Sequence, residues 1–170
     1  MHYNNTNEVF LAYEQSEDKA GESMDSFYQE ALYEAQKAYD ENEVPVGCVI
    51  VKDGKVIGRG YNQMEGAHDP SAHAEVRAIK DACARIGTWR LSGCTLYVTL
   101  EPCLMCAALI RKSRIRKIVI GAIEPREGAF GSVVSINDLP PGGIHVESAW
   151  LYDEASENLL KQFFKELRKP

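Results

Sequence analysis

Apolar and polar residues follow two different periods along the first half of this chain, which predicts one helix and a pair of strands. Apolar residues recur at helical spacing from about Ser26 to residue 39. A run rich in β-branched residues then covers 44–51, and an Asp53-Gly54 pair leads into a second such run over 55–61. Because Asp-Gly favours the tight turns that join antiparallel strands, the two runs are expected to form a β-hairpin.

The second half of the chain alternates between helical and strand patterns. Ser71 is expected to cap a helix that runs through Ile86, because a Ser hydroxyl can accept a bond from the first backbone N–H groups, and Gly87 is expected to end it. The remaining predicted elements are a strand over 94–100, a helix over 103–112, a strand over 117–121, a loop-rich stretch over 122–143 and a helix over 154–167.

This order of elements, with room for a further strand before the last helix, predicts an α/β protein with three layers (α/β/α). Helices would cover both faces of a single mixed sheet of about five strands. The nearly all-apolar run at 117–121 supports this fold, because a strand with no polar face must be buried on both sides. Residues 1–24 show no sustained period and are rich in Asn, Glu and Ser. We therefore expect an acidic, disordered extension before one domain over 25–170.

Composition and charge narrow the class of protein. The 170 residues are 45% hydrophobic and 26% charged, which is ordinary for a soluble globular protein, and no apolar run is long enough to span a membrane. The net charge of −6 is uneven: residues 1–43 carry 11 acidic and 2 basic residues, which leaves residues 44–170 with a net charge of +3. Basic clusters at 111–117 and 161–169 are either solvated helix faces or a footprint for a phosphate backbone.

Five cysteines, an odd number, favour a reducing compartment over a disulfide framework. The polar, acidic N-terminus resembles neither a secretory signal nor a transit peptide. We therefore expect a cytoplasmic protein.

His73, Cys103 and Cys106 are the candidate metal ligands. The two cysteines, spaced i and i+3 at the start of a predicted helix, share one helix face and can hold one ion together. A structural zinc site closes with four protein ligands, usually as two pairs, whereas a catalytic site uses three and leaves the fourth position to water. One Cys-x-x-Cys and one His therefore indicate a catalytic zinc site.

Glu75, two residues after His73, is the candidate catalytic residue. Zinc lowers the pKa of a bound water towards about 7, and a nearby carboxylate can take the proton and pass it to the substrate. Attack of that water on an amidine-type carbon, followed by loss of ammonia, is hydrolytic deamination. A carboxylate at this position could instead merely cap or solvate its helix.

With these residues in view, the chain resembles the cytidine-deaminase-like superfamily and, within it, the tRNA-specific adenosine deaminases. The resemblance covers about 25–168 and rests on the His-x-Glu…Pro-Cys-x-x-Cys signature together with 43–47, 60–62, 68–75, 96–103, 128–132 and 163–164. It implies one zinc ion per subunit held by His73, Cys103 and Cys106, Glu75 as the proton shuttle, and Asn62 as a residue that holds the target base. It also implies a homodimer that converts the wobble adenosine (A34) of a tRNA anticodon stem-loop to inosine.

Several alternatives remain open from the sequence alone. A deaminase of free guanine, cytosine or a nucleoside would share the chemistry, because the walls of the pocket and not the zinc ion choose the base. A non-catalytic, zinc-stabilised subunit or a metal-free thiol-redox protein would use the cysteines, although neither needs Glu75. Asn62 could be only a turn residue after its strand.

Overall fold

The core of the protein is a five-stranded sheet in the order β2-β1-β3-β4-β5. The computed structural model describes residues 24–140 and 143–168, with side chains from residue 26 onward. β1 runs antiparallel to β2 and β3, whereas β3, β4 and β5 run parallel to one another, so the sheet is mixed, as predicted. The strands are β1 (Gly47–Lys52), β2 (Lys55–Tyr61), β3 (Thr95–Leu100), β4 (Lys117–Ala122) and β5 (Glu147–Trp150).

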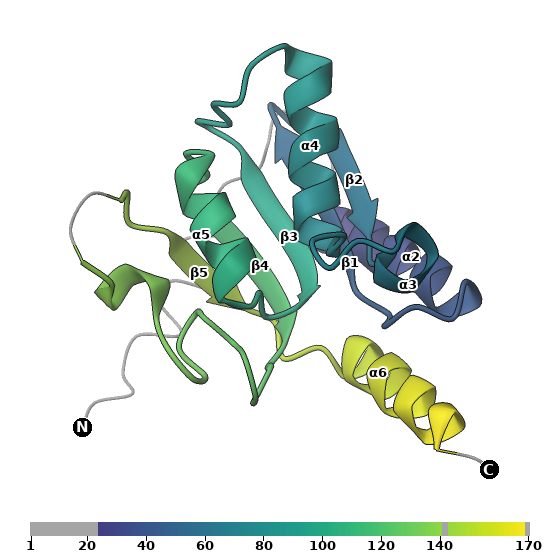
Figure 1. The fold of residues 1–170 in the computed structure, drawn as a ribbon. Helices are drawn as coiled ribbons and strands as arrows, with labels where there is room; N and C mark the ends of the chain where they lie inside the picture. Colours follow the sequence, from purple (N-terminus) through teal and green to yellow (C-terminus); the bar gives the residue numbers. More distant parts are fainter. Residues whose placement is uncertain (1–23, 141–142, 169–170) are drawn as a thin grey trace.

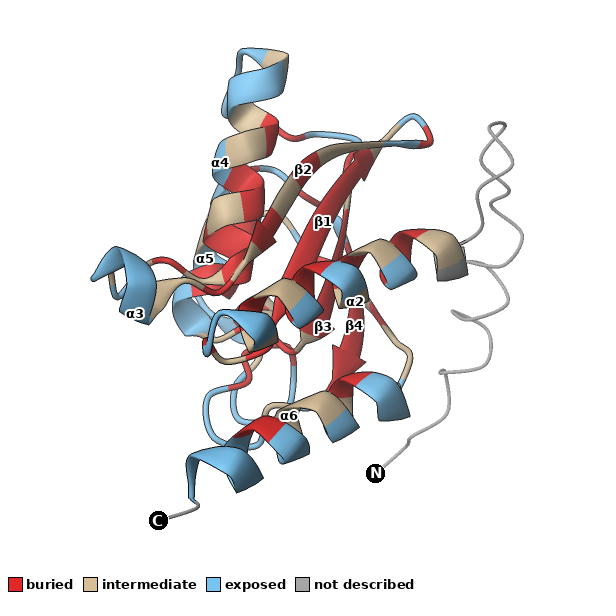
Figure 2. Cartoon of the chain, turned by 90° about the vertical axis from the view of Figure 1, so that its right-hand side faces the viewer, coloured by how far each residue is buried: buried red, intermediate tan, exposed pale blue. Residues whose placement is uncertain are grey.

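Helices cover both faces of this sheet. α4 (Ala74–Ile86) and α5 (Leu104–Lys112) lie on one face, while α2 (Met24–Asp40) lies on the other with α6 (Glu154–Leu167) beside it (Figures 1 and 2). Two short helices, α3 (Met64–Ala67) and η1 (Ile136–Asp138), stand in the connections. The three-layer α/β/α architecture expected from the sequence is confirmed.

Alternation along the central strands builds a separate core on each face. In β3, Leu96 and Val98 pack in the cluster beneath α4 and α5, whereas Tyr97 packs in the cluster beneath α2. Successive side chains of a strand point to opposite faces, so a strand between two helical layers is buried on both sides. Figure 2 shows the central strands as mostly buried, and four of the five residues of the apolar 117–121 run are buried, as predicted.

Three local expectations need correction. The N-cap of α4 is His73 and not Ser71, whose hydroxyl instead donates to the Asp69 carboxylate at 2.7 Å. β1 begins at Gly47 and not at residue 44, because Pro45 has no N–H to contribute to a strand ladder. α3 and η1 were not expected, since elements of four and three residues are too short to show a period.

The turn residues behave as predicted. Asp53 and Gly54 both have positive φ, 49° and 70°, which suits the tight turn between β1 and β2. Gly87, with φ 72°, ends α4. The predicted N-terminal extension, residues 1–24, lies outside the described residues except for Met24. Within the described ranges, no helix has the length and apolar character needed to cross a bilayer.

Candidate active site

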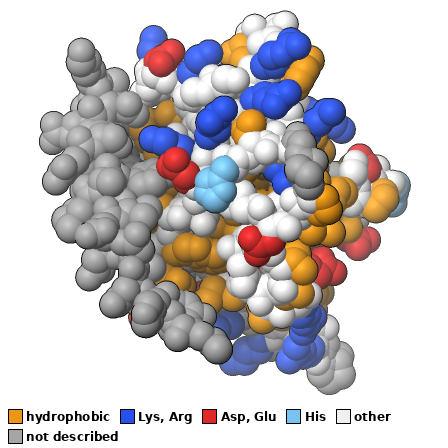
Figure 3. Space-filling view, turned by 90° about the vertical axis from the view of Figure 1, so that its left-hand side faces the viewer, with side chains coloured by type: hydrophobic (Ala, Val, Ile, Leu, Met, Phe, Trp, Pro, Cys, Tyr) orange, Lys and Arg blue, Asp and Glu red, His pale blue; other side chains and the backbone are white. Residues whose placement is uncertain are grey.

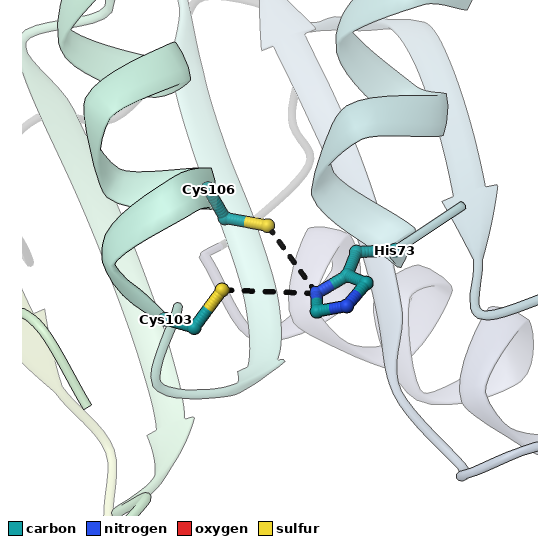
Figure 4. Close-up of side chains that lie close together, drawn as sticks. All are labelled: His73, Cys103 and Cys106. Atoms are coloured by element: carbon teal, nitrogen blue, oxygen red, sulfur yellow. Dashed lines mark hydrogen bonds between the residues drawn. The ribbon is translucent and has the colours of Figure 1, made fainter. Parts of the chain in front are cut away.

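The three candidate metal ligands come from the starts of two neighbouring helices. His73 is the N-cap of α4 and Cys103 is the N-cap of α5, both with extended backbone, and Cys106 lies in the first turn of α5. His73 Nδ1 lies 3.8 Å from Cys103 Sγ and 3.5 Å from Cys106 Sγ (Figure 4). The structure therefore brings together residues that are 30 and 33 positions apart in the chain.

These distances fit a single tetrahedral zinc ion. With Zn–S near 2.3 Å and Zn–N near 2.0–2.1 Å, a tetrahedral angle separates a bound sulfur from a bound nitrogen by about 3.6 Å. The ligand atoms of His73, Cys103 and Cys106 all lie within 4.8 Å of one another. They are the one group of three such ligands found among the described residues, so protein atoms there supply three positions and leave the fourth open, as in a catalytic site.

Hydrogen bonds among these side chains favour a thiolate at Cys103. The bond from the Cys106 thiol, followed by the bond from His73, lowers the pKa of Cys103 to about 4. The same contact with Cys103, together with burial, raises the pKa of Cys106. The bond with Cys103 also raises the pKa of His73. A site that already stabilises negative charge on sulfur suits a divalent cation, because the thiolate is the form that binds metal.

The Glu75 carboxyl is buried beside the ligands. Glu75 lies in the first turn of α4 with only 3% of its surface exposed. Burial raises its pKa to about 7. The charge of His73 lowers this pKa and the charge of Cys103 raises it, both by less than burial does. A carboxyl that only solvated its helix would be exposed, so this burial argues against solvation, while the hydrogen bond of Glu75 with its own backbone N–H still fits a cap of α4.

Asn62 is buried next to the start of the same helix. Its side-chain oxygen accepts a hydrogen bond from the Ala74 backbone N–H at 2.8 Å. That N–H belongs to the first turn of α4 and has no partner within the helix. The bond leaves the side-chain NH₂ of Asn62 as the group available to a ligand.

Glu101 is a residue near the site to which the sequence analysis gave no role. It follows β3 directly, precedes Pro102 and Cys103, and is only 2% exposed. Its carboxylate accepts hydrogen bonds from the backbone N–H groups of the segment that follows β4. One feature of the sequence could have drawn attention to Glu101: it is a charged residue between an apolar strand and the Pro-Cys pair.

The fold and the three-ligand site are those of the zinc-dependent deaminases. The sequence model of the family described as "Cytidine and deoxycytidylate deaminase zinc-binding region" matches residues 22–122, a range that contains all three ligands and Glu75.

More specific relatives narrow this class. The tRNA-specific adenosine deaminase of Aquifex aeolicus is 48% identical over 145 residues, which is 84% of this chain and 94% of the relative. The Bacillus subtilis enzyme of the same name is 42% identical over 149 residues, 86% of this chain and 92% of the relative. The chain therefore belongs to the tRNA-specific adenosine deaminase family.

Solved structures agree with this assignment. A structure from a study of A-to-I editing by tRNA:A34 deaminases is 44% identical, with a TM-score of 0.70, over 73% of this chain and 95% of that one. A guanine deaminase from Bacillus subtilis is 29% identical, with a TM-score of 0.57, over 71% of this chain and 87% of that one. The fold is shared with free-base deaminases, while the sequence is closer to the tRNA enzymes.

Proposed function

We propose that this protein is a zinc-dependent hydrolase that deaminates the wobble adenosine (A34) of a tRNA anticodon loop to inosine. The observation that carries the proposal is the buried Glu75 carboxyl beside a set of three metal ligands. Two tRNA-specific relatives at 48% and 42% identity support the choice of substrate.

The proposed reaction uses few groups of the protein. His73, Cys103 and Cys106 would hold one zinc ion per subunit, which when bound supplies a Lewis acid that lowers the pKa of a water towards about 7. Glu75 would accept a proton from the attacking water on its carboxylate and donate it to a ring nitrogen of adenine. It would then take the proton of the added hydroxyl group and pass it to the departing amine, so that adenosine and water give inosine and ammonia.

Asn62 is proposed to hold the target base. Because its side-chain oxygen already accepts the Ala74 N–H, its NH₂ group can only donate. A purine offers ring nitrogens as acceptors for such a donor. The same bond attaches Asn62 to the start of α4, directly after His73. It therefore holds the NH₂ donor at a fixed position relative to the metal ligands.

An anticodon loop suits a buried site of this kind. The target base in a loop is already unpaired, so little energy is needed to move it into a pocket. The main alternative, deamination of free guanine or cytosine, has weaker support, since the guanine deaminase structure is 29% identical to this chain. A non-catalytic subunit would not need the buried Glu75, and this favours the enzyme.

We further propose that the protein is a homodimer. Leu104 and Met105, in the first turn of α5, are 47% and 41% exposed, and Val133 and Val134 are 51% and 41% exposed. The two pairs lie on joined segments, because Gly128 accepts from the N–H groups of both valines and pairs with Cys103. On the face of the molecule that Figure 3 shows, hydrophobic side chains gather in the lower half and along the right, with Lys and Arg above them and at the lower edge. An apolar surface of this kind suits a second copy of the chain.

We also propose that residues 25–170 form one deaminase domain, to which residues 1–24 add an acidic extension, and that the protein works in the cytoplasm. All five cysteines are free, which supports a reducing compartment. Deletion of residues 1–23 should leave the melting temperature and the zinc content unchanged; a large loss of either would make the extension part of the domain.

The decisive experiment incubates the purified, zinc-loaded protein with an RNA stem-loop that carries a wobble adenosine, beside free guanine and cytosine. We expect inosine in the RNA and no ammonia from the free bases. A matched stem-loop with guanosine at the wobble position controls for deamination elsewhere in the RNA. Ammonia from a free base alone would reverse the choice of substrate.

A further inference from the structure

We propose that Glu101 is a positioning residue that holds the segment after β4 beside the metal-binding end of β3, where this segment would form one wall of the substrate pocket. The wall segment is defined here as residues 123–135, the stretch that follows β4. The chain folds this segment back beside the start of α5 (Figure 1).

Three backbone N–H groups of the wall segment converge on one carboxylate. Phe130 N donates to Glu101 Oε1 at 2.9 Å and Ser132 N donates to the same oxygen at 3.1 Å. Glu124 N donates to Oε2 at 3.1 Å. The three donors span nine positions of the wall segment, so a single side chain sets the path of most of it.

Backbone contacts place this carboxylate next to a metal ligand. Glu101 is two residues before Cys103, and Ala129 N donates to the intervening Pro102 carbonyl at 2.9 Å. Cys103 and Gly128 form an isolated β-bridge. A Cβ at Gly128 would overlap the Glu101 carboxylate, so the glycine permits the close approach of the two segments. The wall segment and the Cys103 ligand thus form one connected unit.

Glu101 has no cationic partner in the part of the chain that the structure describes, where the salt bridges involve other acids. Its buried charge is therefore balanced by N–H dipoles, which form a small anion-binding concavity. A carboxylate is suited to this place, because both of its oxygens accept. An amide would turn an NH₂ group towards at least one N–H donor and lose that bond.

The wall segment lies close enough to the site to affect it. Gly128, in the middle of this segment, pairs directly with Cys103, one of the candidate metal ligands. The consequence for turnover rests on the proposed function: a wall held at a fixed distance from the metal would align the nucleotides that flank the target adenosine.

Hydrogen exchange tests, without any substrate, whether Glu101 holds the wall segment in place. In zinc-loaded Glu101→Gln, the amides of Glu124, Phe130 and Ser132 should as a group exchange about tenfold faster, since at least one hydrogen bond is lost and the others go to an uncharged acceptor. Because an amide oxygen in place of Oε1 preserves two of the three bonds, Glu124 should show the largest change. The amides of β3 and β4 should stay protected.

Glu43→Gln is the matched control. Glu43 is another buried carboxylate that accepts backbone N–H bonds, from Glu65 at 3.2 Å and Gly66 at 2.7 Å. Its substitution should speed exchange at Glu65 and Gly66 while leaving the wall segment unchanged. Gly128→Ala should also speed exchange in the wall segment, because the added methyl group would meet both the Glu101 carboxylate and the Glu124 backbone carbonyl.

Kinetics test the consequence with the RNA stem-loop. Glu101→Gln should keep one zinc per chain and raise KM about tenfold, with kcat within about threefold of the wild type. Unchanged exchange in the wall segment, or loss of zinc together with global unfolding, would overturn the proposal. If the wild type fails to deaminate the RNA, the proposed function fails, while the exchange data still decide the role of Glu101.

Discussion

The Asn62 side-chain oxygen lies 2.8 Å from the Ala74 backbone nitrogen and accepts its hydrogen bond. This contact joins the end of β2 to the first turn of α4, one residue from the His73 ligand. In the proposed role the amide would have two separable tasks, because the oxygen serves the fold and the NH₂ group would be left to bind a substrate.

Asn62→Asp separates these tasks. The carboxylate keeps an acceptor for the Ala74 N–H but has no NH₂ donor, so stability should change little while KM for the RNA rises about tenfold. Asn62→Ala should in addition lower the free energy of unfolding by about 1–2 kcal/mol, because it leaves a buried N–H unpaired. Denaturation and steady-state kinetics measure the two effects. Wild-type kinetics in Asn62→Asp would contradict the role in base binding.

Glu75→Gln tests the proton shuttle. The amide has nearly the same shape but cannot accept the proton of the attacking water, so kcat should fall by about 10²–10⁴-fold while one zinc per chain remains. Glu65→Gln, which changes an exposed acid in α3, is the control and should keep full activity. Full turnover in Glu75→Gln would exclude the mechanism.

Removal of the metal should abolish activity reversibly. A strong chelator should stop deamination and lower the melting temperature, because an ion that binds only the folded state stabilises it, by about 2.7 kcal/mol when free zinc is at 100 times Kd. Zinc alone should restore both properties.

Cys106→Ser should lose zinc, whereas Cys83→Ser, which changes a free thiol outside the ligand set, should keep it. Stoichiometric zinc in Cys106→Ser would show that the ligand set is wrong.

Tyr28→Phe tests the attachment of α6. The Tyr28 hydroxyl donates to Asp153 Oδ2 at 3.1 Å, and Asp153 caps α6 by accepting from Ser156 N at 2.8 Å. Loss of the hydroxyl should lower the free energy of unfolding by about 1 kcal/mol at pH 8. Tyr33→Phe, at an exposed position of α2, the helix that also carries Tyr28, should have little effect and is the control.

The same tyrosine gives a pH dependence. Burial, with the Asp153 carboxylate adding to it, raises the pKa of Tyr28 above its usual value near 10. The native state therefore holds this proton more firmly than the unfolded chain does. The resulting stability is present below about pH 10 and is lost as the pH rises from there through the raised value. Tyr28→Phe should lose less stability than the wild type between pH 9 and 11, and equal slopes would contradict this account.

The oligomeric state can be tested by placing charges on the exposed apolar surface formed by Leu104, Met105, Val133 and Val134. Leu104→Glu and Val133→Glu place charges on that surface, and each should shift the protein from dimer to monomer in light scattering after size exclusion. Tyr152→Glu, at an exposed aromatic residue in the connection between β5 and α6, should leave the mass unchanged. A wild-type protein that is monomeric at micromolar concentration would contradict the dimer.

Much of the fold follows from local patterns in the sequence. The hairpin at Asp53-Gly54, the end of α4 at Gly87 and the two-sided burial of β4 all depend on neighbouring residues, and the structure confirms them. The cap of α4 was wrong because Ser71 has a closer partner in Asp69, a competition that a capping rule does not weigh.

The grouping of the three candidate metal ligands was also predictable, since their residue types and spacing form a specific motif. The partners of Asn62 and Glu101 were not predictable in the same way. The donors to Glu101 lie 23, 29 and 31 positions away, in a segment with no helical or strand period. Contacts of that kind depend on the complete fold and leave no regular trace in the sequence.

Parallel pairing of β3 with β4 has a consequence for how such a protein can diverge. Parallel strands end at the same edge of a sheet. The turn that carries Cys103 therefore adjoins the long connection between β4 and β5, although the two segments are separate in the sequence. Lengthening a surface connection costs little conformational entropy, about 0.6 kcal/mol for each doubling. Insertions or substitutions in that connection can therefore reshape what the enzyme accepts while its chemistry is inherited intact.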